Sequence, residues 1–183
     1  MNRETAIEIL FEHTKSDALR KHAFAVESCM LAYAEKFGEN KEEWSVTGIL
    51  HDFDYEMYPN APDHPMKGSE VLKERGVDEK IRRAILGHAS YTDVPRDTLL
   101  AKALFACDEL AGFITAVALV RPNKTVDEVE AKSVLKKMKD KAFARNVNRE
   151  DIILGAQELN AELNEHIQFC IDAMKKNKDL LGL

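Results

Sequence analysis

The 183-residue chain has few of the residues that interrupt helices and no clear strand pattern. It contains five prolines and eight glycines, and no run of alternating β-branched residues indicates a strand. Its three cysteines are far apart and include no Cys-x-x-Cys pair. This excludes a zinc ribbon and a disulfide framework, and favours a reducing, cytoplasmic location. The opening MNRETAIEILFEHTK lacks the apolar core of a signal peptide.

The chain also lacks an excess of positive charge and a long uninterrupted hydrophobic run. Its net charge is -6, which disfavours binding to nucleic acid or to an anionic membrane. The most apolar stretch, 99–120, contains Lys102, Asp108 and Glu109, so we expect a core helix and not a membrane span. Basic residues gather within 131–149. We expect a solvated helix face there, or alternatively a rim that attracts phosphate.

Helical periodicity runs along the whole sequence and predicts a single all-α domain over residues 1–183. No linker, repeat or low-complexity segment divides it. The expected helices cover about 2–14, 16–38, 41–57, a short segment up to 76, one from 78, a long apolar helix from 97 or 98, a basic helix opened by a Thr125–Glu128 capping box, and a last long helix opened by Asn148 and Asp151.

Polar residues interrupt the apolar faces of four of these helices. His22 and His88 fall on inward stripes, and Asp108 continues the stripe of the long apolar helix. The pair His51–Asp52 follows the apolar run VTGIL. Burying a carboxylate costs several kcal/mol unless it is paired or bound to a metal. These positions therefore need partners.

Each position has a simple explanation when it is taken alone. An inward histidine is usually a hydrogen-bonded core residue. A buried aspartate can pair with an arginine such as Arg82, Arg83 or Arg121. Together, however, imidazole and carboxylate groups from separate helices favour a site for a divalent ion, such as Mn²⁺, Fe²⁺, Co²⁺, Ni²⁺, Zn²⁺ or Mg²⁺.

The order H…HD…H…H…D resembles the HD-domain superfamily of metal-dependent phosphohydrolases, which are all-α. The phrases LRKHAFAVE, GILHDFDYE, DHPMKGSEVL, AILGHAS and ACDELAGFITA are similar to the HDIG-type branch of predicted hydrolases. The chain has Phe53–Asp54 in place of Ile-Gly, and a single His88 where the binuclear cyclic-dinucleotide phosphodiesterases carry paired histidines and a GYP signature. The resemblance implies a metal-site core over about 16–121, followed by basic C-terminal helices over 122–183.

The resemblance also implies the ligands. Whether one ion or two bind remains open, and we favour two because both histidines of the second site, His64 and His88, are present. His64 lies in the loop PNAPDHP and has the alternative of a plain surface residue. The first ion would be held by His22, His51, Asp52 and Asp108, and the second would share Asp52 and take His64 and His88.

For catalysis we expect Asp52 and Asp54 to act. Asp54 lies three residues after His51, on the same face of the expected helix. It would orient that histidine or accept the proton from water; the alternative is a solvated residue at a helix end. We expect Glu109, which adjoins a ligand, to face away from the site.

Weaker candidates for contacts to substrate phosphate are Lys67, Lys136 and Arg145. We expect His13 and His166, which have charged neighbours, to be solvated.

These observations predict a cytoplasmic metal-dependent phosphohydrolase acting on a phosphate mono- or diester of a small molecule, with a nucleotide as the favoured substrate. Nucleic acid and membrane are not expected as partners, and nothing in the sequence predicts an oligomeric state. Two alternatives stay open. One is a non-catalytic metal- or nucleotide-binding regulatory domain, and the other is a di-iron oxygenase with the HD fold.

Overall fold

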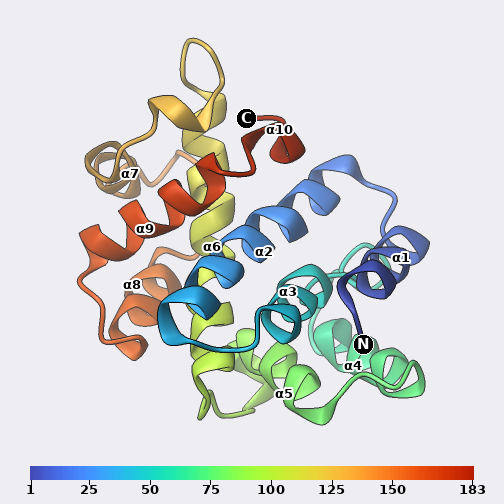
Figure 1. Cartoon of the computed structure of the whole chain (residues 1–183). Helices are drawn as coiled ribbons and strands as arrows, with labels where there is room; N and C mark the ends of the chain where they lie inside the picture. Colours follow the sequence, from blue (N-terminus) through green and yellow to red (C-terminus); the bar gives the residue numbers. More distant parts are fainter.

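The computed structural model describes all 183 residues, and it confirms the all-α fold (Figure 1). Two helices of 21 residues, α2 and α6, cross near the middle of the molecule, and the other helices pack around them. The ten α-helices are α1 (Arg3–His13), α2 (Asp17–Phe37), α3 (Lys41–Leu50), α4 (Asp63–Glu74), α5 (Glu79–His88), α6 (Leu99–Leu119), α7 (Ala131–Met138), α8 (Arg149–Glu158), α9 (Leu163–Lys175) and α10 (Lys178–Leu181), with 3-10 helices at Ser90–Thr92 and Val126–Glu128.

The boundaries of the two long helices follow from their capping residues. The hydroxyl of Ser16 accepts a hydrogen bond from the Leu19 amide and begins α2. Gly38, in the left-handed region at φ 70°, ends it. Thr98 caps the start of α6 in the same way as Ser16 caps α2. All three boundaries agree with the sequence prediction.

The predicted helix 41–57 is shorter than expected, because α3 ends at Leu50 and residues 51–57 form turns. The carbonyl oxygen of Gly48, which a continuing helix would bond to the amide of Asp52, accepts a hydrogen bond from the His51 ring. The His51–Asp52 pair therefore stands at the end of the helix, and Asp54 does not share a helix face with His51.

The C-terminal third also differs from the prediction in two places. Thr125 caps only the 3-10 turn Val126–Glu128, and α7 begins later with a capping box between Glu130 and Ser133. The predicted last long helix is two helices, α8 and α9. Asn160, at φ 51°, takes the left-handed conformation that asparagine tolerates, and the chain changes direction there.

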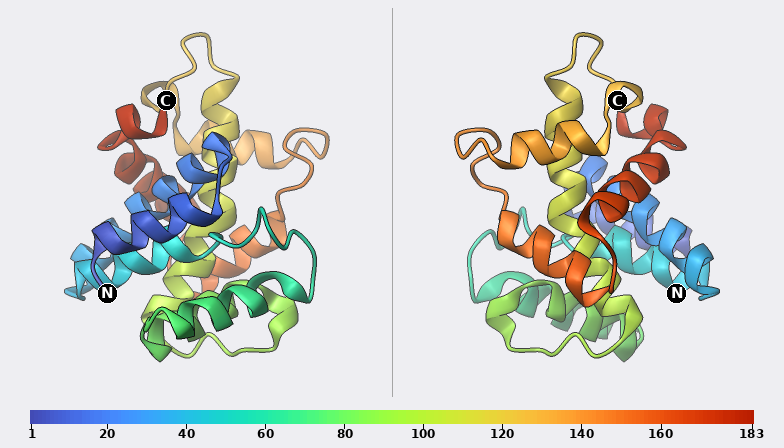
Figure 2. Two further views of the ribbon diagram at one scale, coloured as in Figure 1. Left: turned by 90° about the vertical axis from the view of Figure 1, so that its right-hand side faces the viewer. Right: turned by 90° about the vertical axis from the view of Figure 1, so that its left-hand side faces the viewer.

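The packing brings the ends of several helices to one side of α6. Helix α5 lies against the beginning of α6 and α4 packs on α5, while the connection to α7 lies at the far end of α6 (Figure 1 and Figure 2). Helix α3 approaches α2 closely at Gly48, where a β-carbon would lie 2.8 Å from the Glu27 Cα atom. One cluster of 43 buried residues, drawn from both ends of the chain, forms the core. No helix combines the length and apolarity that a membrane crossing requires.

Candidate metal centre

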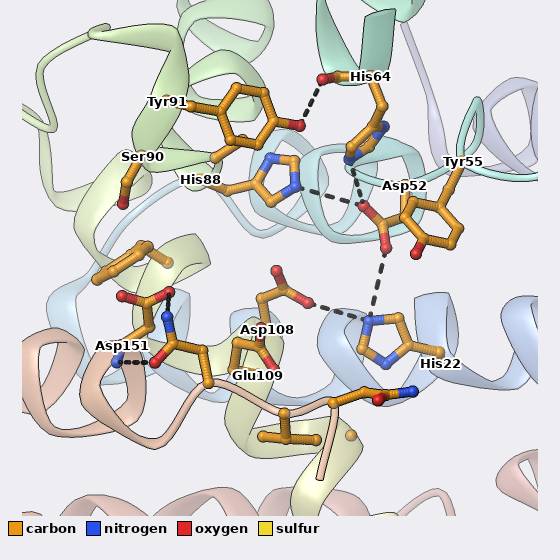
Figure 3. A pocket seen from close by; sticks show the side chains of 16 residues that line it. His22, Asp52, Tyr55, His64, His88, Ser90, Tyr91, Asp108, Glu109 and Asp151 are labelled. Carbon is orange, nitrogen blue, oxygen red and sulfur yellow. Dashed lines mark hydrogen bonds and ion pairs between the residues drawn. The ribbon is translucent and has the colours of Figure 1, made fainter. Parts of the chain in front are cut away.

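Six side chains, from α2, α4, α5, α6 and the turn that follows α3, meet at one place, and they are the six ligands that the resemblance implies. Figure 3 shows five of them, without His51. The potential ligand atoms of all six form two groups, in each of which all atoms lie within 4.8 Å of one another. Both groups contain Asp52. The first group is His22, His51, Asp52 and Asp108; the second is Asp52, His64 and His88.

The first group surrounds a single space with two imidazoles and two carboxylates. The Asp108 Oδ1 atom lies 3.0 Å from His22 Nε2 and 3.3 Å from His51 Nε2. The Asp52 Oδ2 atom lies 3.5 Å from His51 Nε2 and 3.9 Å from His22 Nε2. Nitrogen and oxygen atoms at these separations can converge on one divalent ion.

The second group is on the other side of the same carboxylate. Asp52 Oδ1 lies 3.2 Å from His64 Nε2 and 3.3 Å from His88 Nε2. In Figure 3 the Asp52 carboxylate stands between these two histidines and His22. Asp52 thus offers one oxygen to each group.

The orientation of the rings is set by hydrogen bonds at their Nδ1 atoms. His51 Nδ1 donates to the Gly48 carbonyl at 2.8 Å, and His88 Nδ1 donates to the Ile85 carbonyl. His64 Nδ1 donates to Asp54 Oδ1 at 2.9 Å. Each bond leaves the Nε2 lone pair free to face the centre, the arrangement usual for metal-binding histidines.

The His51 Nε2 atom tests whether a metal fits. His51 is fully buried, and its Nε2 has no hydrogen-bond partner. Buried polar atoms without a partner are rare in native proteins and need an explanation. A cation bound at Nε2 would satisfy the atom, so the residues present fit a metal.

The charges at the centre stabilise one another strongly. Burial lowers the pKa of His51, but Asp52 and Asp108 more than compensate and hold it well above its usual value. Burial likewise opposes the rise in the pKa of His64, which Asp52 and Asp54 bring to about 9. The pKa of Asp52 lies well below its usual range despite burial, chiefly through His51. The cluster therefore binds positive charge, either as protons or as a metal ion that displaces them.

Asp54 has a different partner from the one expected. It is buried, and besides His64 it accepts a hydrogen bond from the Gly68 amide at 3.1 Å. A β-carbon on Gly68 would overlap the Asp54 carboxylate, so glycine is required there. The expectation that Asp54 orients His51 was wrong because α3 ends before it; Asp54 orients His64.

A cavity of about 670 Å³ opens over the centre. One wall carries Tyr55 and Tyr91, and the phenol of Tyr91 donates to the His64 carbonyl. The opposite wall carries Asn146 and Asp151, from the segment that leads into α8 and from α8 itself. None of these four residues was considered for the site from the sequence, since only the fold brings them to the centre.

Glu109 also lines this cavity, so the expectation that it faces away was wrong. It is half-buried. Burial, and secondly the charge of Asp108, raise the pKa of Glu109 to about 7.

The three basic residues considered for phosphate do not line the cavity. Lys67 forms an ion pair with Asp63 at 2.9 Å, and Lys136 and Arg145 are exposed. Indeed, no lysine or arginine is among the residues that line the cavity.

None of the arginines suggested as partners for a buried aspartate pairs with Asp52 or Asp108. Arg82 donates to the Val77 carbonyl, and Arg83 pairs with Asp97. Arg121 makes no ion pair with Asp52 or Asp108. Histidines, and not arginines, surround the two aspartates.

The expectation of solvated histidines elsewhere was wrong for His166 and only partly right for His13. His13 is half-exposed and donates to the Ile9 carbonyl. His166 is buried: its Nε2 donates to the Ala106 carbonyl at 2.9 Å, and its Nδ1 accepts from the Tyr33 hydroxyl at 2.6 Å. The spacing could have revealed this, because His166 falls three residues after Leu163 on the apolar stripe of α9.

The fold and the site together define the class of protein: it is an all-α protein with a histidine–aspartate centre where several helices meet. Comparison with known families gives the same answer: the sequence model of the HD domain matches residues 19–112, about half of the chain and all six converging residues. The chain belongs to the HD domain family, whose members are mostly metal-dependent hydrolases that bind divalent ions. No curated protein and no solved structure matches the chain.

Proposed function

We propose that the protein is a metal-dependent phosphohydrolase that cleaves a phosphate mono- or diester of a small molecule, with nucleotides as the favoured class. One observation carries the proposal. Asp52 presents its two oxygens to two separate sets of histidines, directly beneath a cavity of about 670 Å³. A purely structural ion needs no such open side.

The residues of the first group would hold one divalent ion, and His64 and His88 would hold a second that shares Asp52. A divalent ion supplies water of lowered pKa and neutralises charge on a phosphoryl oxygen. Mixed nitrogen and oxygen ligands suit Mn²⁺, Fe²⁺, Co²⁺, Ni²⁺ and Zn²⁺.

The chain's own residues have distinct tasks in this proposal. Asp54 fixes the tautomer and the direction of His64 through the bond at 2.9 Å. Tyr91 holds the backbone at His64 through its bond to the carbonyl oxygen. Asn146 and Asp151 provide polar groups that would contact the part of the substrate away from the phosphate.

A screen of phosphate esters tests the proposal. Purified protein would be assayed with added Mn²⁺ against a broad panel of nucleotides and generic mono- and diesters. We expect phosphate or alcohol release by the wild type and none by Asp52→Asn. Asp97→Asn, which alters an exposed carboxylate outside the centre, is the matched control and should keep full activity. No turnover of any ester, with nucleotide binding retained, would favour the regulatory domain instead.

The composition of the cavity also supports a second candidate function, the di-iron oxygenase. Because no lysine or arginine lines it, neutralisation of a phosphate would depend on the bound ions alone. The same ligands could hold two irons for oxygen chemistry on a less charged substrate. Coloured protein with two equivalents of iron and substrate-dependent oxygen consumption would support the oxygenase, while hydrolysis under nitrogen would contradict it.

A further inference from the structure

The three cysteines of the chain, far apart in sequence, meet at one point in the core. Cys29 is on α2, Cys107 on α6 and Cys170 on α9. All three are fully buried and reduced, and their sulfur atoms lie within 4.8 Å of one another. Thus three separate helices bring every thiol of the protein together.

Ordinary packing does not readily account for this meeting. Cysteine packs as a small apolar side chain, so a single buried cysteine needs no explanation. The structure has 62 buried residues. A buried residue touches roughly 6–12 others, so two further cysteines placed at random would both touch the first in only a few per cent of cases, on the order of one in forty.

His166 lies beside the cluster and is prepared as a ligand. Its Nδ1 atom is 3.8 Å from Cys170 Sγ. Because Nε2 donates to the Ala106 carbonyl, the lone pair is on Nδ1. A backbone carbonyl that fixes the far nitrogen in this way is characteristic of zinc-bound histidines.

We propose that Cys29, Cys107 and Cys170 bind a thiophilic metal ion, zinc, with His166 Nδ1 as the fourth ligand. Binding releases the three thiol protons to solvent, and the Tyr33 hydroxyl gives up its hydrogen bond to Nδ1. The proposal is independent of the function proposed for the histidine–aspartate centre.

The dimensions agree with such a site. Tetrahedral zinc with bonds of about 2.3 Å to sulfur and 2.0–2.1 Å to nitrogen keeps its ligand atoms roughly 3.6–3.8 Å apart. The distance of 3.8 Å between His166 Nδ1 and Cys170 Sγ is close to this value. His166 lies outside the group of ligand atoms that are all within 4.8 Å of one another, so its ring would need to move toward the other two sulfur atoms. The sulfur atoms, within 4.8 Å of one another, would need to close by at most about 1 Å, which side-chain rotation provides. A set of three thiolates and one histidine is a closed, structural zinc site.

A cavity apart from the one over the histidine–aspartate centre reaches the side chains beside the cluster, although none of the three cysteines lines it. This cavity, of about 370 Å³, is lined by Tyr33 and His166. Bound zinc would join α2, α6 and α9 and would fix Cys107, the residue that precedes Asp108. We therefore expect zinc to stabilise the fold and to fix the position of α6 beneath the histidine–aspartate centre, which we call the open centre because a cavity lies over it.

X-ray absorption of the zinc-loaded wild-type protein tests the site directly. We expect sulfur scatterers at about 2.3 Å, and an intense thiolate-to-cobalt charge-transfer band when Co²⁺ replaces zinc. Only nitrogen and oxygen scatterers, with no such band, would overturn the proposal. In Asp52→Asn, which should lose the ions of the histidine–aspartate centre, a zinc spectrum with three sulfurs and no nitrogen would overturn the part assigned to His166.

Two matched sets of variants then separate the two clusters. Asp52→Asn should keep the sulfur signal and one zinc per chain, whereas Cys29→Ser and Cys170→Ser should lose the sulfur signal and bind one zinc per chain fewer than the wild type. Tyr33→Phe removes only the competing hydrogen bond at Nδ1 and should bind zinc at least as tightly as the wild type. If the serine variants do not fold, the wild-type spectrum still decides the question.

Discussion

The histidine–aspartate centre and the cysteine cluster share two helices, α2 and α6, yet they differ in exposure and in ligand chemistry. His22 and Cys29 stand two turns apart on α2, and Asp108 directly follows Cys107 on α6. Neighbouring residues on a helix diverge by about 100°, so one step along α6 changes the cluster that a side chain enters. One pair of helices thus supports two sites.

The difference between the two clusters lies in exposure and in the type of ligand. The first offers nitrogen and oxygen atoms beneath a cavity of about 670 Å³. The second offers sulfur atoms that are fully buried. Open sites with mixed ligands allow a substrate to approach, while closed thiolate sites stabilise a fold. Both clusters contain metal-ligating residues. Access of a substrate to the ligands therefore distinguishes the candidate catalytic site from the candidate structural site.

The largest expected effect comes from Asp52→Asn, which removes the charge shared by both groups of the open centre. We expect loss of its divalent ions and a fall of hydrolysis to the level of metal-free protein. Metal analysis of unsupplemented protein, with an ester assay, measures both. A variant with the full metal content of the wild type would show that Asp52 is not a ligand.

The next effect divides the open centre into its two halves. His88→Ala removes a residue of the second group only, so one ion should remain bound while activity falls. His51→Ala removes a residue of the first group and should lose the ion between His22 and Asp108. Manganese titration followed by electron paramagnetic resonance counts the ions. Complete metal loss in His88→Ala would indicate one shared site.

A smaller effect is expected from Asp54→Asn, which weakens the support of His64 without touching the substrate cavity. Loss of such a supporting carboxylate typically lowers metal affinity by about 10–100-fold. Competition with a chelator measures the change. Asp97→Asn again serves as the exposed control. Equal metal affinities in the two variants would show that Asp54 does not support the metal ligand His64.

The smallest effect concerns His166, beside the cysteine cluster, and the dependence of the free energy of unfolding on pH. Burial lowers the pKa of His166, so the folded protein keeps this ring neutral while the unfolded chain gains a proton below about pH 6.5. The corresponding stability is present above that pH and is lost as the pH falls. Between pH 7.5 and 5.5, His166→Gln should lose less unfolding free energy than the wild type, by up to about 1.4 kcal/mol.

Urea unfolding at the two pH values, without added zinc, gives this difference. The histidines of the open centre titrate in both proteins and cancel. An identical loss in the two proteins would mean that His166 is not buried as a neutral ring.

Local sequence signals predicted much of this fold and of the open centre. Ser16, Gly38 and Thr98 are recognisable caps, since capping depends on a few neighbouring residues. The inward positions of His22, His88 and Asp108 follow from helical spacing. That these side chains meet depends on the packing of several helices. Their need for partners favoured a shared divalent ion, and the resemblance to a known family assigned the individual ligands.

The rest depended on contacts that no local pattern encodes. Helix α3 ends where the ring of His51 donates a hydrogen bond to the Gly48 carbonyl, and Asp54, in the turn beyond, bonds to His64. The break at Asn160 required a left-handed residue inside a continuous apolar stripe. The cysteine cluster joins three helices that are distant in sequence, so counting cysteines and their spacing excluded only the local zinc motifs.

Anomalous diffraction from crystals soaked in Mn²⁺ tests the central claim most directly. The account predicts two peaks on either side of the Asp52 carboxylate, about 3.5–4 Å apart, one bordered by His22 and Asp108 and the other by His64 and His88. Saturating manganese with no peak within bonding distance of Asp52 would contradict it.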